Sequence, residues 1–145
     1  MQNEEDSESA PSQPIEVLLV DDHPLIRNLL RKLIGSYANL TVVGEAVNGE
    51  EAVLLAARLK PDVVIMDIHL PILNGVPAAT LIKVNNPFVT VIAITAGGPR
   101  CDEIAMTFAG AAAVINKDDV LNALHPAILN AVKQVKHPVG ARNLD

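Results

Sequence analysis

Residues 61–71 read Pro-Asp-Val-Val-Ile-Met-Asp-Ile-His-Leu-Pro, and this stretch decides the fold class. It places four consecutive apolar side chains, three of them β-branched, directly before Asp67. Uninterrupted apolar runs of this length are typical of strands that are buried on both faces of a parallel sheet. The flanking prolines would interrupt a helix at either end. We therefore expect a buried strand over 62–66, with Asp67 at its carboxyl end.

The same pattern, a short apolar run followed by an amphipathic helix, recurs along the rest of the chain. The run at 15–20 precedes a helix that opens with Pro24, a residue favoured in the first helical turn. Alternating strands and helices indicate an α/β fold with an open, doubly wound sheet of five parallel strands. The expected strands cover 15–20, 40–45, 62–66, 88–95 and 111–115, and the expected helices cover 24–35, 49–59, 76–84, 98–109 and 118–135.

The composition suits one domain of ordinary size. The chain has 145 residues, of which 50% are hydrophobic and only 2% aromatic, so a core of Val, Ile, Leu and Ala is expected. A formal net charge of −6 argues against direct binding to nucleic acid, which needs clustered basic residues. The single cysteine, Cys101, excludes an intramolecular disulfide.

The two ends of the chain differ from its centre. Residues 1–14 are acidic and polar, and we expect them to form a disordered tail. Residues 15–136 form the expected domain, and residues 137–145 a C-terminal tail or the start of a linker. The chain shows neither a secretory signal pattern nor an apolar stretch of the ~18 residues that a membrane span requires. We therefore expect a cytoplasmic protein without membrane association.

Polar residues with related chemistry lie at the ends of four of the expected strands. Asp21 and Asp22 follow the first strand, Asp67 follows the third, Thr95 closes the fourth and Lys117 follows the fifth. Because the carboxyl ends of parallel strands share one edge of the sheet, these side chains should lie together. Three neighbouring carboxylates require a cation, most simply Mg²⁺, which prefers oxygen ligands. The set therefore predicts phosphoryl transfer to a carboxylate nucleophile.

Four parts of the chain resemble the receiver domain of two-component response regulators. They are Val-Leu-Leu-Val-Asp-Asp-His-Pro-Leu-Ile-Arg at 17–27, Val-Gly-Glu-Ala-Val-Asn-Gly-Glu-Glu-Ala at 43–52, the loop region 61–75, and the pair 92–96 and 115–118. His-Pro with Arg27 is most similar to the subfamily that is usually linked to LuxR-type DNA-binding domains. The resemblance implies the flavodoxin-like (βα)5 receiver architecture.

The resemblance also implies a role for each residue of the site. Asp67 would accept a phosphoryl group from a histidine kinase or phosphotransfer protein, so the chain would be a regulatory phosphoacceptor and not an enzyme. The other implied roles are Mg²⁺ binding by Asp22, Asp67 and the backbone carbonyl of His69, a water-mediated contact from Asp21, and phosphoryl binding by Thr95, Ala96 and Lys117. Gly75 is expected to permit the backbone turn that ends the loop.

Two positions depart from the usual receiver pattern. Many receivers carry an aromatic residue three positions before the lysine, and here that position holds Val114. Thr95 and Val114 are therefore the expected switch positions, with backbone shifts after Thr95 in place of a moving aromatic ring. Asp118 stands where many receivers have proline, so we expect no cis peptide there.

The output of such a receiver stays open at this stage. The chain fits either a stand-alone receiver that docks to a protein or a piece of a longer regulator. Homodimers through helical faces are an expectation taken from the resemblance. No helix-turn-helix segment follows the last expected helix, so we expect no direct DNA binding by this chain.

Several alternative functions also remain. A Mg²⁺-dependent phosphatase with an aspartate nucleophile normally has a second acid two residues further on, where this chain has His69. A flavin binder of the same architecture needs a phosphate loop that Asp21 and Asp22 would repel. A vestigial interaction module and a transition-metal site using His23 and His69 are further alternatives. Outside the site, Cys101 is expected to be a packed or idle thiol, and His125 and His137 to be helix-surface and tail residues.

Overall fold

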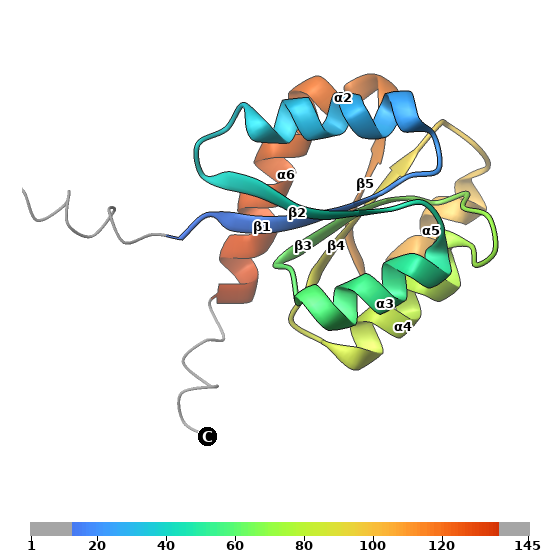
Figure 1. Cartoon of the computed structure of the whole chain (residues 1–145). Coiled ribbons are helices and arrows are strands. Elements are labelled where there is room, and N and C mark those ends of the chain that lie inside the picture. Colours follow the sequence, from blue (N-terminus) through green and yellow to red (C-terminus); the bar gives the residue numbers. More distant parts are fainter. Residues whose placement is uncertain (1–12, 137–145) are drawn as a thin grey trace, which may run out of the picture.

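The five strands form a single parallel sheet with helices on both faces (Figure 1). The computed structural model describes residues 13–136, the side chains of residues 135 and 136 excepted. The strand order β2-β1-β3-β4-β5 is a doubly wound topology. The strands are β1 (Ile15–Val20), β2 (Leu40–Ala46), β3 (Val63–Asp67), β4 (Thr90–Thr95) and β5 (Ala111–Asn116). The helices are α2 (Pro24–Gly35), α3 (Gly49–Leu59), α4 (Gly75–Asn85), α5 (Arg100–Phe108) and α6 (Val120–Lys136), with a 3₁₀ turn η1 (Lys117–Asp119) before the last.

Each face of the sheet has its own apolar core. α2 and α6 cover one face, where Val17, Leu19 and Ile65 are fully buried, while α3, α4 and α5 cover the other face over Leu18 and Val64. Neighbouring strand residues alternate between the two cores because successive side chains point to opposite sides of a strand. Both faces are therefore covered, which explains why the central strands are continuous apolar runs.

Four strands begin or end one or two residues away from the expected positions, and β2 and β5 each extend one residue further. β3 ends on Asp67 and not before it, because Asp67 still pairs with Ile94 of β4. β4 begins at Thr90 and not at 88, because a turn with a hydrogen bond from Val89 N to Asn86 O (3.2 Å) precedes it. Asp67 is thereby held by the sheet itself, which fixes its backbone more firmly than a loop would.

The last two helices also differ from the expectation. The helix predicted over 98–109 begins at Arg100, because the extended backbone of Pro99 forms its N-cap. The helix predicted over 118–135 is divided into η1 and α6. The side chain of Asn116 accepts a hydrogen bond from Asp118 N (2.9 Å) and shapes the turn between the strand and the helix.

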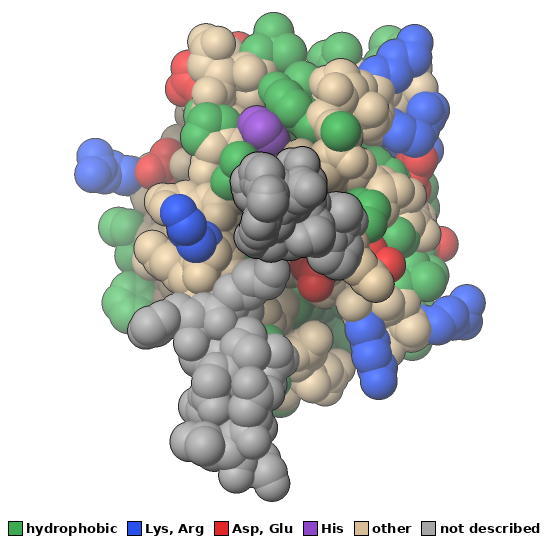
Figure 2. Space-filling view, turned by 90° about the vertical axis from the view of Figure 1, so that its left-hand side faces the viewer, with side chains coloured by type: hydrophobic (Ala, Val, Ile, Leu, Met, Phe, Trp, Pro, Cys, Tyr) green, Lys and Arg blue, Asp and Glu red, His purple; other side chains and the backbone are tan. Residues whose placement is uncertain are grey.

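The amino-terminal edge of the sheet lies on the opposite side of the molecule from the ends of β1 and β3. Figure 2 looks onto this side, and basic, acidic and apolar side chains are interspersed over the part of it that is visible. His125 lies on α6 as expected, but its ring is half-buried and stacks on Tyr37 with ring centroids 3.8 Å apart. His125 is therefore a packing residue and not a plain surface residue.

The described part of the chain bears on three further expectations. Between residues 13 and 136, no helix combines the length and the apolar character needed to cross a bilayer. The same residues contain no cis peptide bond, in agreement with the prediction at Asp118. The acidic tail predicted over 1–14 lies almost wholly outside the described residues, and the predicted tail over 137–145, with His137, lies entirely outside them.

Candidate functional site

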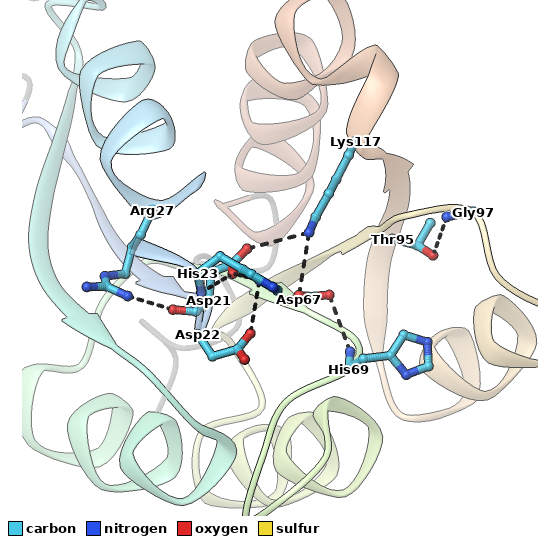
Figure 3. A network of polar contacts seen from close by, with 9 residues as sticks. All are labelled: Asp21, Asp22, His23, Arg27, Asp67, His69, Thr95, Gly97 and Lys117. Carbon is cyan, nitrogen blue, oxygen red and sulfur yellow. Dashed lines mark hydrogen bonds and ion pairs between the residues drawn. The ribbon is translucent and has the colours of Figure 1, made fainter. Parts of the chain in front are cut away.

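Three carboxylates meet at the carboxyl edge of the sheet (Figure 3). Asp21 and Asp22 follow β1, and Asp67 is the last residue of the neighbouring strand β3. Asp21 is 1% exposed and Asp67 is 4% exposed, whereas Asp22 is half-buried. A carboxylate oxygen of each aspartate and a ring nitrogen of His23 all lie within 4.8 Å of one another. The sheet therefore brings the three carboxylates together, as their positions after the strands predicted.

Lys117 extends over this cluster from η1. Its Nζ lies 3.6 Å from Asp67 Oδ2 and 4.0 Å from Asp21 Oδ2. The positive charge of Lys117 therefore stabilises the ionised Asp67 side chain and any anionic group attached to it. One ammonium group cannot neutralise three carboxylates, so the cluster keeps a net negative charge.

The surroundings of Asp67 act on its charge in both directions. Burial raises the pKa of Asp67 and is the largest influence, and the charges of Asp21 and Asp22 raise it further. The Lys117 ammonium and a hydrogen bond from His69 N to Asp67 Oδ1 (3.3 Å) act to lower the same pKa. The net effect is a raised pKa, which means that the ionised form of Asp67 lacks a full set of compensating charges.

Two buried oxygen atoms in the cluster lack hydrogen-bond partners. They are Asp21 Oδ2, which has Lys117 Nζ at 4.0 Å, and Asp22 Oδ1, which has His23 Nδ1 at 3.2 Å. An unpaired buried carboxylate oxygen is costly, and a bound cation removes that cost. Carboxylate oxygens are also the ligands that Mg²⁺ prefers. The residues present therefore fit a hard divalent cation.

Arg27 supports the cluster from α2. Its Nη1 donates a hydrogen bond to the backbone carbonyl of Asp21 (2.8 Å), and its Nε donates to Glu45 Oε1 (2.8 Å). Glu45 Oε2 accepts a further hydrogen bond from Arg31 Nε (3.0 Å). Arg27 thus ties α2 and β2 to the turn that carries the acidic pair. From the sequence alone, Arg27 was noted only as part of the resemblance. Its ion pair with Glu45 could not be predicted, because Glu45 lies 18 residues further along the chain.

Thr95 lies at the same edge of the sheet but does not contact the carboxylates directly. Its side chain is buried, and its Oγ1 accepts a hydrogen bond from Gly97 N (3.1 Å). Gly97 has φ +98°, a conformation that favours glycine, and Ala96 is exposed. The hydroxyl of Thr95 is thus engaged by the loop that follows it, and Ala96 lies in that loop.

The loop after Asp67 returns tightly upon itself. Gly75 N donates a hydrogen bond to Ile68 O (2.8 Å), and a Cβ at Gly75 would lie 2.6 Å from Ile68 O and 2.8 Å from Asp67 O. Glycine is therefore required by close backbone approach and not by a positive φ. Within this loop the exposed Ile72 does have a positive φ (69°), which is strained for a β-branched residue.

Two predicted positions are farther from the cluster. The ring of His69 turns away from the aspartates, and its Nε2 lies 3.1 Å from Asp102 Oδ2 on α5 (Figure 3). The transition-metal alternative required both histidines near the carboxylates. The ring of His23 lies beside them, but the ring of His69 does not. Val114 is half-buried on β5 and lines a shallow hollow of about 280 Å³ with Ile104 and Phe108. Cys101 is exposed on α5 and therefore not packed.

The fold and the site together define an α/β signalling domain of the flavodoxin-like receiver architecture. Residues 17–129 match the family described as the response regulator receiver domain. The chain belongs to this family, which is a module of two-component response regulators.

Individual relatives show how far this similarity extends. The nitrate/nitrite response regulator protein NarL of Escherichia coli K12 is 33% identical over 119 residues, which cover 79% of this chain and 55% of NarL. The protein-glutamate methylesterase/protein-glutamine glutaminase of Nitrosospira multiformis is 42% identical over 105 residues, covering 70% of this chain and 29% of that protein. A LuxR-family two-component response regulator from Aurantimonas sp. SI85-9A1 superposes with a TM-score of 0.79 at 25% identity, covering 92% of this chain and all of that one.

NarL and the Aurantimonas regulator agree with the resemblance to LuxR-type regulators, whereas the methylesterase is a relative of another kind. The chain spans about half the length of NarL and less than a third of the methylesterase.

Proposed function

We propose that Asp67 is the phosphoacceptor of this receiver and that phosphorylation there switches its binding to a partner or to a second copy. The observation that carries the proposal is the buried Asp67 with Lys117 Nζ 3.6 Å from its Oδ2 and two further carboxylates beside it. A carboxylate oxygen of Asp67 attacks the phosphorus of a phosphohistidine on a kinase or phosphotransfer protein. The P–N bond breaks as the new O–P bond forms, and the histidine leaves.

The neighbouring side chains divide the remaining tasks. Asp22, Asp67 and the backbone carbonyl of His69 would hold Mg²⁺ directly, and Asp21 would hold it through water. When bound, Mg²⁺ neutralises charge on the phosphoryl oxygens. Lys117 pairs with the phosphoryl group as its charge arrives on Asp67. Thr95 exchanges its hydrogen bond from Gly97 N for one to the phosphoryl group, and the small Ala96 leaves room beside it.

The signal then leaves through the loop after Thr95. Val114 has no ring that could change rotamer, so movement of the Gly97 loop and of α5 is the proposed readout. The His69–Asp102 contact links that helix to the loop that follows the phosphoacceptor. We further propose that the protein works in the cytoplasm and binds a histidine kinase or phosphotransfer protein, without contacting membrane or DNA through these residues.

The proposal treats the chain as a regulatory phosphoacceptor and not as an enzyme. The match to the methylesterase covers only 29% of that protein, and residues 17–129 of this chain match the receiver family. A phosphatase with an aspartate nucleophile is also disfavoured, because the side chain two residues after Asp67 is an imidazole that faces Asp102. The carboxylic acid that normally protonates the leaving group in such phosphatases is therefore absent from that position.

The test is phosphorylation by a small donor. The protein is incubated with acetyl phosphate, with and without Mg²⁺, and followed by intact mass spectrometry and amide NMR. We expect a Mg²⁺-dependent adduct of one phosphoryl group that is absent in Asp67→Asn and retained in the control Asp119→Asn, whose side chain is exposed on η1. An unmodified wild-type protein would indicate a vestigial module, and steady phosphate release from unrelated monoesters would indicate a phosphatase.

A further inference from the structure

The outer surfaces of α3 and α4 carry exposed apolar side chains. The two helices pack side by side over one face of the sheet (Figure 1). Leu54 of α3 is 63% exposed, and Leu81 and Val84 of α4 are 46% and 71% exposed. A hollow of about 340 Å³ between the helices, with Val53 and Ile82 in its lining, continues this apolar surface from one helix to the other. Contiguous exposed apolar surface is typical of an interaction site.

On α3, Leu54 lies between two opposite charges. Glu50, Leu54 and Arg58 follow one another at intervals of four residues, which brings them to one side of the helix. The helical rise of about 1.5 Å per residue places each charge about 6 Å from Leu54 along the helix axis. Both charged side chains are exposed, and neither forms an ion pair with any residue that the structure describes. We call the surface formed by Glu50, Leu54, Arg58, Leu81 and Val84 the α3–α4 face.

The order of charges on α3 is complementary to itself when the helix direction is reversed. A twofold axis that crosses α3 beside Leu54 turns the α3 of a second copy antiparallel to the first. Leu54 then meets Leu54 of the second copy, and each Glu50 meets an Arg58. The only charged residue of α4, Lys83, does not oppose this arrangement, because its ammonium group is bound by two backbone carbonyls of its own chain.

We propose that the α3–α4 face joins two copies of the chain in an antiparallel, twofold dimer. The charges favour a second copy as the occupant, because a matching surface must carry the reverse order of charges and the chain itself supplies that order. The proposal goes beyond the proposed function of Asp67, since no residue of this face belongs to the acidic cluster. Association through this face therefore does not require phosphorylation.

The test is a set of charge reversals followed by sedimentation velocity of unphosphorylated protein over a range of concentrations. Wild type should associate, and Glu50→Arg and Arg58→Glu should each weaken association at least about tenfold, because like charges then face each other. The double variant Glu50→Arg/Arg58→Glu should associate as wild type does. An equimolar mixture of the two single variants should also associate, since each supplies the charge that the other lacks. Both side chains are exposed, so circular dichroism should show wild-type folding in every variant.

Leu54→Ser tests the centre of the interface, and Phe108→Ser on α5 is its matched control, because Phe108 is 88% exposed on a different helix. We expect Leu54→Ser to weaken association and Phe108→Ser to leave it unchanged. A wild-type protein that is monomeric at every concentration, or single variants that do not associate on mixing, would overturn the proposal. A dimer lost in Phe108→Ser and kept in Glu50→Arg would also overturn it, since the interface would then lie on α5.

The dimer and the phosphoacceptor fail in different measurements. A phosphoryl adduct on Asp67 in a chain that stays monomeric would refute the dimer alone. A dimer that takes up no phosphoryl group would refute the phosphoacceptor alone.

Discussion

At the scale of single residues, Asp67 combines deep burial with an incomplete set of neutralising partners. Its raised pKa means that the folded protein binds a proton here more tightly than the unfolded chain does. The carboxylate therefore lowers stability above its folded pKa, and this loss disappears as pH falls through that value toward the unfolded value of 3.8. In metal-free buffer, Asp67→Asn should raise Tm at pH 7.5 by roughly 4 °C, equivalent to about 1 kcal/mol.

The size of this increase should shrink as the pH of the melting experiment is lowered, because both proteins are then neutral at position 67. Thermal melts in EDTA at several pH values measure this difference. Asp119→Asn is the control, since its exposed side chain should give a Tm close to that of wild type at every pH. An Asp67→Asn variant that is less stable than wild type at pH 7.5 would show that Lys117 compensates the charge fully.

A second residue-scale prediction concerns Lys83. Its Nζ donates to Pro87 O and Val89 O, both at 2.8 Å, and burial lowers its pKa. Lys83→Met leaves these two carbonyls without that donor, so we expect a loss of about 1–3 kcal/mol in urea unfolding. Lys32→Met removes a lysine that is exposed on α2 and should change stability by less than about 0.5 kcal/mol. Equal effects in both variants would refute the structural role of Lys83.

At the scale of elements, the loop from β3 to α4 depends on close backbone contact at Gly75. An alanine Cβ there would meet two carbonyl oxygens at 2.6 and 2.8 Å, so the loop or the helix must move. We expect Gly75→Ala to lower the free energy of unfolding by about 2–4 kcal/mol. It should also shift the amide NMR signal of His69, whose N–H donates a hydrogen bond to Asp67 Oδ1.

The matched control for this change is Gly35→Ala at the end of α2. A Cβ at Gly35 would have no atom within 4 Å, so the variant should be neutral or stabilised by up to about 1 kcal/mol. Urea unfolding of both variants separates the cost of the steric clash at Gly75 from the general effect of replacing glycine by alanine in a helix. A Gly75→Ala protein as stable as Gly35→Ala would show that the loop accommodates a side chain.

The elements also show how far sequence reasoning reaches. Apolar runs predicted all five strands, and the rule for ligands at strand ends brought Asp21, Asp22, Asp67 and Lys117 to one edge of the sheet. Three details could not be predicted, because they depend on side-chain rotamers and loop conformations that an apolar pattern does not specify. They are the bond of Arg27 to the Asp21 carbonyl, the turn of His69 toward Asp102, and the engagement of Thr95 by Gly97.

At the scale of the whole molecule, a bound cation should stabilise the fold, because the unfolded chain cannot assemble the site. Binding at ten times Kd contributes about 1.4 kcal/mol. We therefore expect Tm to rise with Mg²⁺ or Mn²⁺ concentration in wild type and to change little in Asp22→Asn, measured by differential scanning fluorimetry with an external dye. Asp119→Asn should retain the wild-type response, and a metal-independent Tm for wild type would contradict the site.

The stack of Tyr37 on His125 has a practical consequence for optical work. Tyr37 is the only tyrosine and the chain has no tryptophan, so intrinsic emission comes essentially from one ring. That ring lies on the turn after α2, at the edge of the sheet opposite Asp67, and faces α6 with planes 10° apart. Its fluorescence therefore reports the packing of α6, while the acidic edge has no intrinsic fluorophore of its own and needs an introduced one for fluorescence work.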